Sequence, residues 1–318
     1  MPTTRKQQLV YGCMGFGGSW DLTPYTREDL RTAERAVSTA LEVGVRVFDH
    51  ADIYRSGKAE AVFGEILARD GTLRSSIRIQ TKCGIRVGES GLGVHYNLDK
   101  QAIVNRVRAS LERLQVEWVD TLLLHRPDPL MEPELVAEAL TELHSEGLVR
   151  QVGVSNMAGV QMAALQRHLD LPIVVNQLEL SLQKRDWIEA GIGVNGDQGI
   201  AYDFPLGTLE YCAANGVALQ AWGSLARGIY SGAYLDSASP ADQGTAVLVS
   251  SLAEQYGVAP EAVVLGWLMR HPADVSPVIG TTDPDRIRAC AGATAVAAQL
   301  TRAEWYSLFA TARGQDVP

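Results

Sequence analysis

The sequence has few of the features that mark several large classes of protein. It contains only four cysteines in 318 residues, at Cys13, Cys83, Cys212 and Cys290. None forms a C-x-x-C pair, so neither a zinc ribbon nor a thioredoxin-like redox pair is encoded, and we expect four small buried side chains. No run approaches the roughly 18 apolar residues of a transmembrane helix, and the N-terminal MPTTRKQQLVYG lacks the apolar core of a signal peptide. The sequence therefore predicts a cytoplasmic protein without a membrane partner.

Positive charge is also scarce. The formal net charge is −9 at pH 7, and no Lys/Arg-rich run interrupts the acidic balance. Nucleic acids and anionic lipids are bound by basic surfaces, so neither is expected as a partner. If the ligand is an anionic dinucleotide, its positive contacts must be local. No pattern in the sequence indicates a particular oligomeric state.

What the sequence does contain is a regular alternation of short β-branched runs and longer helical periodicities. The expected strands are 46–50, 77–83, 119–125, 149–155, 173–178, 218–222 and 275–280, with a further one within 10–17. Alternating strands and helices favour parallel pairing with crossover helices. About eight such units, without a linker or a change in composition, predict one closed (β/α)8 barrel over residues 1–318.

The helices are predicted from their caps and apolar stripes. Thr26 precedes a helix that ends at Gly44, and later helices end before Gly147 and at Gly216. The stretch 182–205 has mixed polarity and many glycines, with room for a short helix near Trp187. Because it follows the fifth strong strand, we expect it at the barrel mouth, as either a lid or a solvated surface insertion.

Polar residues stand where successive strands end, which is where barrel enzymes place their sites. These residues are Asp49, Lys82, His125, Ser155, Asn156, Asn176, Gln177, Trp222 and Ser224, and Tyr54 follows in the first of the loops.

Four of these residues suit proton delivery. A free tyrosine, with a pKa near 10, is a poor acid at neutral pH, and the ammonium of Lys82 would lower the pKa of Tyr54. Asp49 would keep Lys82 protonated and oriented, while His125 would orient a carbonyl oxygen or assist the proton transfer. Each residue alone also has a structural interpretation, namely a turn cap for Asp49, a half-buried loop aromatic for Tyr54, a solvated charge for Lys82 and a structural histidine for His125. Their conjunction at successive strand ends favours function.

The sequence resembles the aldo-keto reductase superfamily at these residues. The segments that carry the resemblance are MGFGG, VRVFDHADIY, IQTKCG, VDTLLLHRPDP, LVRQVGVSN, VVNQLELS, LQAWGSLARG and PVIGTTDPDRI, which span nearly the whole chain in this order. The HADIY, KCGI, HRPDPLM and HYN segments and the WYSLFATARGQDVP tail are most similar to the bacterial YdhF-type branch.

The resemblance implies a (β/α)8 barrel that binds extended NADP(H) without a Rossmann fold and reduces a small-molecule carbonyl substrate. It implies a catalytic tetrad of Asp49, Tyr54, Lys82 and His125, with Tyr54 as general acid. It further implies that the nicotinamide is held by Ser155, Asn156 and Gln177 and stacks on Trp222, where the family usually has Tyr. The residues implied around the pyrophosphate are Ser224, Leu225, Arg227 and Gly228, and those around the 2′-phosphate are Gly280, Thr281, Thr282 and Arg286.

The sequence departs from the family pattern at the adenosine end. Ala289 and Cys290 replace the Glu and Asn that hold the adenine in many members. Thr281-Thr282 replaces a basic residue, which leaves Arg286, with Arg288 beside it, as the cationic contact for the 2′-phosphate.

Three alternatives to the reductase are weighed. A Rossmann dehydrogenase would need G-x-G-x-x-G, but position 20 is Trp20. A metal-dependent barrel hydrolase would use His50, Asp52 and His125, close to the cationic Lys82. A non-catalytic NADP(H)-binding sensor or regulatory subunit would share the barrel but has no need of Tyr54. The substrate is indicated only loosely, by Trp20, Trp187 and Tyr202, which would supply apolar walls or simply pack.

Overall fold

A computed structural model describes residues 8–194, 202–233 and 238–318. Within these ranges eight parallel strands close into a barrel in the order β1-β10-β9-β8-β7-β6-β3-β2. The strands are β1 (Val10–Gly12), β2 (Val47–Asp49), β3 (Arg78–Cys83), β6 (Val119–Leu124), β7 (Val149–Ser155), β8 (Ile173–Glu179), β9 (Ala218–Trp222) and β10 (Val275–Ile279). The predicted fold class is confirmed, and a closed barrel is incompatible with the open sheet of a Rossmann dehydrogenase.

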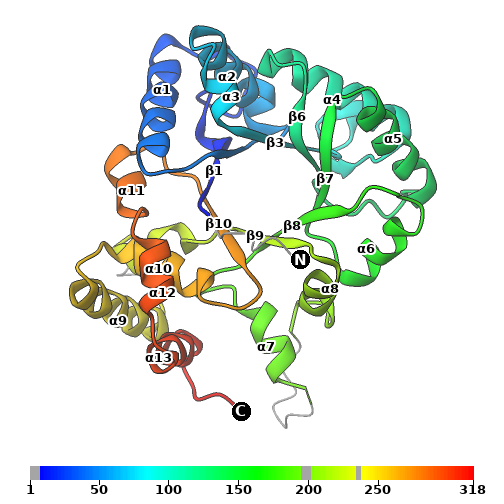
Figure 1. Ribbon diagram of the computed structural model, residues 1–318. Coiled ribbons are helices and arrows are strands. Elements are labelled where there is room, and N and C mark those ends of the chain that lie inside the picture. Colours follow the sequence, from blue (N-terminus) through cyan, green and yellow to red (C-terminus); the bar gives the residue numbers. More distant parts are fainter. Residues whose placement is uncertain (1–7, 195–201, 234–237) are drawn as a thin grey trace.

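Helices form a ring around the strands (Figure 1). They are α1 (Arg27–Glu42), α2 (Lys58–Arg69), α3 (Leu73–Ser76), α4 (Lys100–Leu114), α5 (Pro133–Ser145), α6 (Gly159–Gln166), α7 (Asp186–Ile192), α8 (Thr208–Asn215), α9 (Pro240–Tyr256), α10 (Pro260–Met269), α11 (Pro284–Ala289), α12 (Ala293–Gln299) and α13 (Arg302–Arg313). Short 3-10 turns are η1 (Cys13–Gly15), η2 (Tyr54–Gly57), η3 (Glu89–Gly91) and η4 (Ala226–Ser231). In the described residues, no helix is long and apolar enough to cross a bilayer.

The predicted helix signals act as expected. Thr26 caps α1 reciprocally with Asp29, since the Thr26 hydroxyl accepts from the Asp29 amide and the Asp29 carboxylate accepts from the Thr26 amide. The chain leaves α1 through Gly44 at φ +87° and closes α8 with Gly216 at φ +67°, a conformation that glycine adopts without strain. The predicted short helix near Trp187 is α7.

One antiparallel hairpin departs from the alternation. It consists of β4 (Ile85–Val87) and β5 (Val94–Tyr96), directly after β3. Arg86 joins it to the loop after β2, with Nη1 lying 3.5 Å from the Asp52 carboxylate. The hairpin therefore extends the wall above the strand ends on the side of β2 and β3.

Candidate active site

A cavity of about 690 Å³ opens at the C-terminal ends of the barrel strands. It is lined by fourteen of the sixteen residues that the sequence predicted for the site: Asp49, Tyr54, His125, Ser155, Asn156, Gln177, Trp222, Ser224, Leu225, Arg227, Gly228, Gly280, Thr281 and Arg286. Of the other two, Lys82 lies behind Asp49 and Tyr54, and Thr282 lies beside Gly15, outside the lining.

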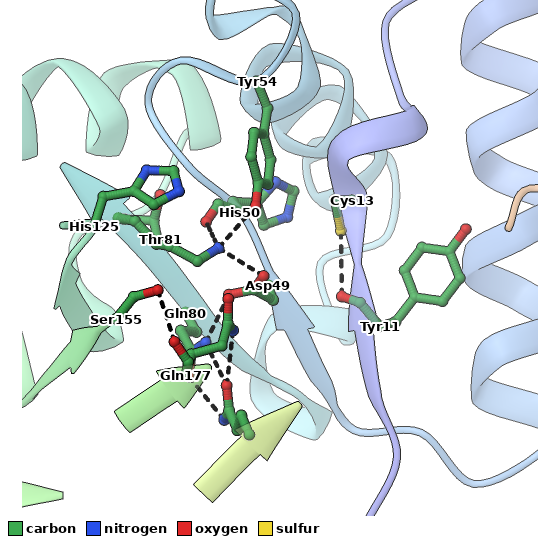
Figure 2. A network of polar contacts seen from close by, with 12 residues as sticks. Tyr11, Cys13, Asp49, His50, Tyr54, Gln80, Thr81, His125, Ser155 and Gln177 are labelled. Carbon is green, nitrogen blue, oxygen red and sulfur yellow. Dashed lines mark hydrogen bonds and ion pairs between the residues drawn. The ribbon is translucent and has the colours of Figure 1, made fainter. Parts of the chain in front are cut away.

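Lys82 is the centre of a hydrogen-bonded group on β2 and β3. Its ammonium nitrogen lies 2.7 Å from Asp49 Oδ2, 2.8 Å from the His50 carbonyl oxygen and 3.0 Å from the Tyr54 hydroxyl. Figure 2 labels the three residues that accept these hydrogen bonds. An ammonium has three N–H donors, so these acceptors use all of them. Lys82 and Asp49 are each 1% exposed, and the solvated interpretation of Lys82 is therefore wrong.

The electrostatics of Tyr54 differ from the expectation. Burial raises the pKa of Tyr54 above its ordinary value, and the positive charge of Lys82 lowers it by less. The prediction that Lys82 brings the pKa below 10 is wrong for the protein alone, because desolvation of the phenolate outweighs the attraction of the ammonium. Tyr54 is therefore a protonated phenol throughout the physiological pH range.

Lys82 and His125 each keep one protonation state. Burial alone would lower the pKa of Lys82, but the Asp49 carboxylate and Tyr54 raise it overall. Burial lowers the pKa of His125 to about 2, helped by the charges of Lys82 and Arg126. His125 packs edge-on to Tyr54, with the ring centroids 6.1 Å apart. A neutral imidazole can orient an oxygen, but it carries no extra proton to give.

A second polar group comes from the ends of β7, β8 and β9. The Ser155 hydroxyl donates to the backbone carbonyl of Gln177 at 2.9 Å, and the side-chain amide nitrogen of Asn156 donates to the Ser155 hydroxyl at 2.8 Å. The Trp222 indole donates to Asn156 Oδ1 at 3.1 Å, which fixes the ring at the cavity wall. These contacts orient amide and hydroxyl groups beside an aromatic face.

The far side of the cavity carries positive charge. Arg227 lies in η4, where it and Gly228 take left-handed φ angles of +58° and +84°. Arg286, on α11, lies 3.3 Å from the Ser231 hydroxyl and 3.6 Å from the Glu261 carboxylate. In a chain with a net charge of −9, two guanidinium groups on this side of the cavity are suited to an anionic ligand.

Comparison with known proteins places this geometry in a family. The model of the aldo/keto reductase family matches residues 8–310. The chain belongs to the aldo/keto reductase family. Over 98% of its length it is 34% identical to the 6-dehydroglucose reductase of Agrobacterium fabrum, covering 95% of that protein. It is 33% identical to oxidoreductase YdhF of Escherichia coli, over 95% of this chain and 94% of that one.

A solved aldo/keto reductase from Klebsiella pneumoniae, in complex with NADP and acetate, has the same fold. It superposes with a TM-score of 0.69 at 22% identity, covering 94% of this chain and 89% of that one.

Some predicted side chains of this aldo/keto reductase lie elsewhere. Trp187 does not line the cavity, because it is 2% exposed and packs against Trp267 and His271. Arg288 also points away, with its guanidinium bound to Glu42 and Asp285. Tyr202 is absent from the lining, whereas Trp20 is part of it.

Ala289 and Cys290, which were expected at the adenosine end, differ in burial, and Ala289 is partly exposed. Cys290 is fully buried, and burial raises the pKa of its thiol to about 12. All four cysteines are free and buried, which confirms the prediction of small core side chains.

The stretch 182–205 has α7 on its first half, and residues 195–201 lie outside the described part. Its described residues do not line the cavity, and its role as a lid stays a prediction.

The residues proposed as metal ligands do not form a metal site. No three His, Cys, Asp or Glu side chains of the described residues cluster as metal ligands do. His50 instead packs on Phe63 with ring centroids 4.7 Å apart, and burial lowers its pKa to about 3.

Several site residues were not predicted from the sequence. Met14, Ile53, Ile85 and Arg126 line the cavity, and Gln80 and Gln220 lie beneath it. Strand alternation gave a signal for the two glutamines, since each stands two residues before a predicted site residue, Lys82 or Trp222. Ile53, Ile85 and Arg126 lie between the predicted strands and helices, where the sequence has no periodicity to use, and Met14 lies in the loosely bounded strand expected within 10–17.

Proposed function

We propose that the chain is an NADPH-dependent aldo-keto reductase that reduces an aldehyde or ketone to an alcohol. Tyr54 is the general acid, assisted by Lys82, Asp49 and His125. The observation that supports this most is the contact of the Lys82 ammonium with Asp49 and Tyr54, at 2.7 and 3.0 Å. A module that only binds a nucleotide has no use for a phenol held by a buried ion pair at the cavity wall.

The cavity residues fit NADP(H). Gln177 Oε1 receives no hydrogen bond from the described residues, which suits the N–H of a carboxamide. We propose that Ser155, Asn156 and Gln177 hold that carboxamide and that the nicotinamide stacks on Trp222. Loops after β9 and β10 would hold the phosphates, through Ser224, Leu225, Arg227, Gly228, Gly280, Thr281, Thr282 and Arg286. When bound, NADPH supplies the hydride to the carbonyl carbon.

The protein's own residues handle the proton. Lys82 donates to the Tyr54 oxygen, so the Tyr54 proton is free for the carbonyl oxygen. That oxygen becomes strongly basic as the carbon is reduced, and a phenol with a raised pKa still transfers its proton to it. Lys82 then stabilises the phenolate, while neutral His125 orients the substrate oxygen.

The substrate side of the cavity is largely apolar. Met14, Trp20, Ile53 and Ile85 form its wall, and Arg126 lies beside His125. We propose a carbonyl compound with an apolar part and oxygen acceptors within reach of Arg126. Because the Agrobacterium relative is a 6-dehydroglucose reductase, a sugar aldehyde belongs among the compounds tested.

We propose the cytoplasm as the place of this reaction. The free, buried cysteines suit a reducing compartment, where disulfides are rare.

The decisive experiment follows NADPH absorbance at 340 nm with aldehydes, diketones, quinones and 6-dehydroglucose. Tyr54→Phe is expected to lower kcat by about 100-fold or more, with little change in NADPH binding. Tyr25→Phe is the control, because its hydroxyl bonds Glu65 outside the cavity. NADPH binding without turnover of any carbonyl would favour the sensor alternative, and a Tyr54→Phe variant with near-normal activity would exclude Tyr54 as the acid.

A further inference from the structure

Two buried glutamines connect the two polar groups of the site through the barrel interior. Gln80 on β3 and Gln220 on β9 are 2% and 9% exposed. Gln80 Nε2 donates to Gln220 Oε1 at 2.8 Å, and Gln220 Nε2 donates back to Gln80 Oε1 at 3.1 Å. Gln80 lies next to Asp49 in Figure 2, and the strands that carry the pair are not neighbours in the barrel. The pair therefore crosses the barrel beneath the cavity.

The carboxylate of Asp49 fixes the orientation of the first amide. A carboxylate accepts hydrogen bonds and donates none. Oδ2 of Asp49 is taken by Lys82, and Oδ1 accepts from Gln80 Nε2 at 2.6 Å. Gln80 must therefore turn its NH2 group toward Asp49, and its second N–H reaches Gln220 Oε1.

The same orientation passes on to Gln177. Gln220 Oε1 accepts from Gln80 and also from Gln177 Nε2, the latter at 2.9 Å. Gln177 thus turns its NH2 group toward Gln220, to which one N–H donates, and its Oε1 remains as an acceptor at the cavity. An isolated glutamine has nearly the same shape after its amide is rotated by 180°, so shape alone does not decide which atom faces the ligand.

Packing from below does not hold these amides. Gln80 and Gln220 also line a second cavity, of about 380 Å³, between the other ends of the strands. We infer that hydrogen bonds determine which way each amide is turned, because the two orientations of an amide have nearly the same shape.

We propose that Gln80 and Gln220 are positioning residues for Gln177. Because Asp49 can only accept hydrogen bonds, it fixes the orientation of the Gln80 amide, and the hydrogen bonds through Gln220 fix that of the Gln177 amide. Gln177 then presents its oxygen to the carboxamide N–H of the nicotinamide. The inference rests on the proposed function, because it needs NADP(H) at the cavity. Asp49 then acts on both halves of the site. Its Oδ2 binds Lys82, which holds Tyr54, and its Oδ1 binds Gln80, which orients Gln177 through Gln220.

An analogue that lacks the carboxamide N–H tests the inference by binding alone. In the 3-acetylpyridine analogue of NADP+, a methyl group replaces the NH2. Calorimetric titration should give a Kd about tenfold weaker for the analogue than for NADP+, because Gln177 Oε1 loses its partner. In Gln80→Met and Gln220→Met, the Gln177 amide is free to rotate. The ratio of the Kd for the analogue to the Kd for NADP+ should therefore fall to about two or less.

The matched control is Gln151→Met. Gln151 lines the lower cavity but is exposed and outside the chain of amides, so the ratio should stay at its wild-type value. Circular dichroism and thermal unfolding check that each variant is folded. The two substitutions interrupt the series of hydrogen-bonded amides at different residues, so one folded variant is sufficient for the test.

Two results would overturn the inference. A wild-type protein that binds NADP+ and the analogue equally would show that Gln177 does not read the N–H, a test that needs no variant. An unchanged ratio in a folded Gln80 or Gln220 variant would show that the amides do not orient Gln177. Failure of the proposed function looks different, because the wild-type protein would then bind neither dinucleotide or would show no Tyr54-dependent NADPH oxidation.

Discussion

The hydroxyl of Tyr54 accepts a hydrogen bond from Lys82 at 3.0 Å, and the direction of that bond determines what Tyr54 can do. Lys82 has only donors, so the Tyr54 oxygen is the acceptor and its own O–H remains available to a ligand. The remaining N–H groups of Lys82 go to Asp49 and the His50 carbonyl, which prevents the ammonium from turning away. The site therefore offers one proton, from one oxygen, in a fixed place.

The pH dependence of reduction follows from this arrangement. We expect kcat to be flat from about pH 5.5 to 9 and to fall only above about pH 10. Burial raises the pKa of Tyr54, so the proton-donating form persists through neutral pH and is lost only as the pH rises past that raised value. His125, with its pKa lowered to about 2, keeps one charge state over the whole range. The measurement is kcat at saturating NADPH, and a break between pH 6 and 7 would contradict it by revealing a titrating histidine.

Removing the carboxylate of Asp49 should cost stability as well as activity. Asp49→Asn leaves the buried Lys82 ammonium without a counter-ion, which typically costs about 3–5 kcal/mol. The double variant Asp49→Asn/Lys82→Met removes both charges and should recover more than half of the lost free energy of unfolding, while remaining inactive. Urea unfolding measures both variants. A single variant as stable as the wild type would show that the ion pair contributes nothing to folding.

Much of the barrel was predictable because local chemistry determines it. The predicted strand 149–155 and the strand 218–222 agree with β7 and β9, and the others differ by a few residues at their ends. Capping residues such as Thr26, and glycines such as Gly44 and Gly216, mark helix ends by their own backbone preferences. Polar residues at successive strand ends predicted the cavity for the same reason, since parallel strands all end at one face.

Contacts that depend on the closed barrel were not predictable. Gln80 and Gln220 are 140 residues apart, and alternation indicates the face of each side chain but not its partner. The family resemblance indicated Arg286 but left the part played by Arg288 open; two residues turn a helix by about 200°, and of the two arginines only Arg286 lines the cavity. The direction of the Tyr54 pKa shift was missed because the sequence shows the charged neighbours but not the depth of burial.

The crossing of α2 and α4 depends on the lack of a side chain at Gly64. A Cβ atom there would overlap the Arg113 carbonyl oxygen and lie 2.8 Å from the Leu114 carbonyl carbon. Both neighbours are backbone atoms, so the helices would have to separate. Gly64→Ala should lower the free energy of unfolding by about 1–3 kcal/mol despite the better helix propensity of alanine. Gly71→Ala is the control, because apart from its chain neighbours no atom of the described residues lies within 4 Å of its Cβ position, and its effect should be within about 0.5 kcal/mol.

The choice between NADPH and NADH should depend on Arg286. Arg286→Ala is expected to raise the KM for NADPH about tenfold and to change the KM for NADH less than about twofold, because only NADPH has a 2′-phosphate to pair with the guanidinium. Arg288→Ala is the matched control, since that side chain is held by Glu42 and Asp285 outside the cavity and should affect neither KM.

Salt provides a second check on the same contact. The Arg286 side chain is 42% exposed, so dissolved ions screen its charge. In the wild-type protein the ratio of the KM for NADH to the KM for NADPH should therefore decrease as ionic strength rises. In Arg286→Ala this salt dependence should largely disappear. Equal changes in the two KM values on substitution would show that Arg286 does not contact the 2′-phosphate, and the proposed preference for NADPH would then lose its structural basis.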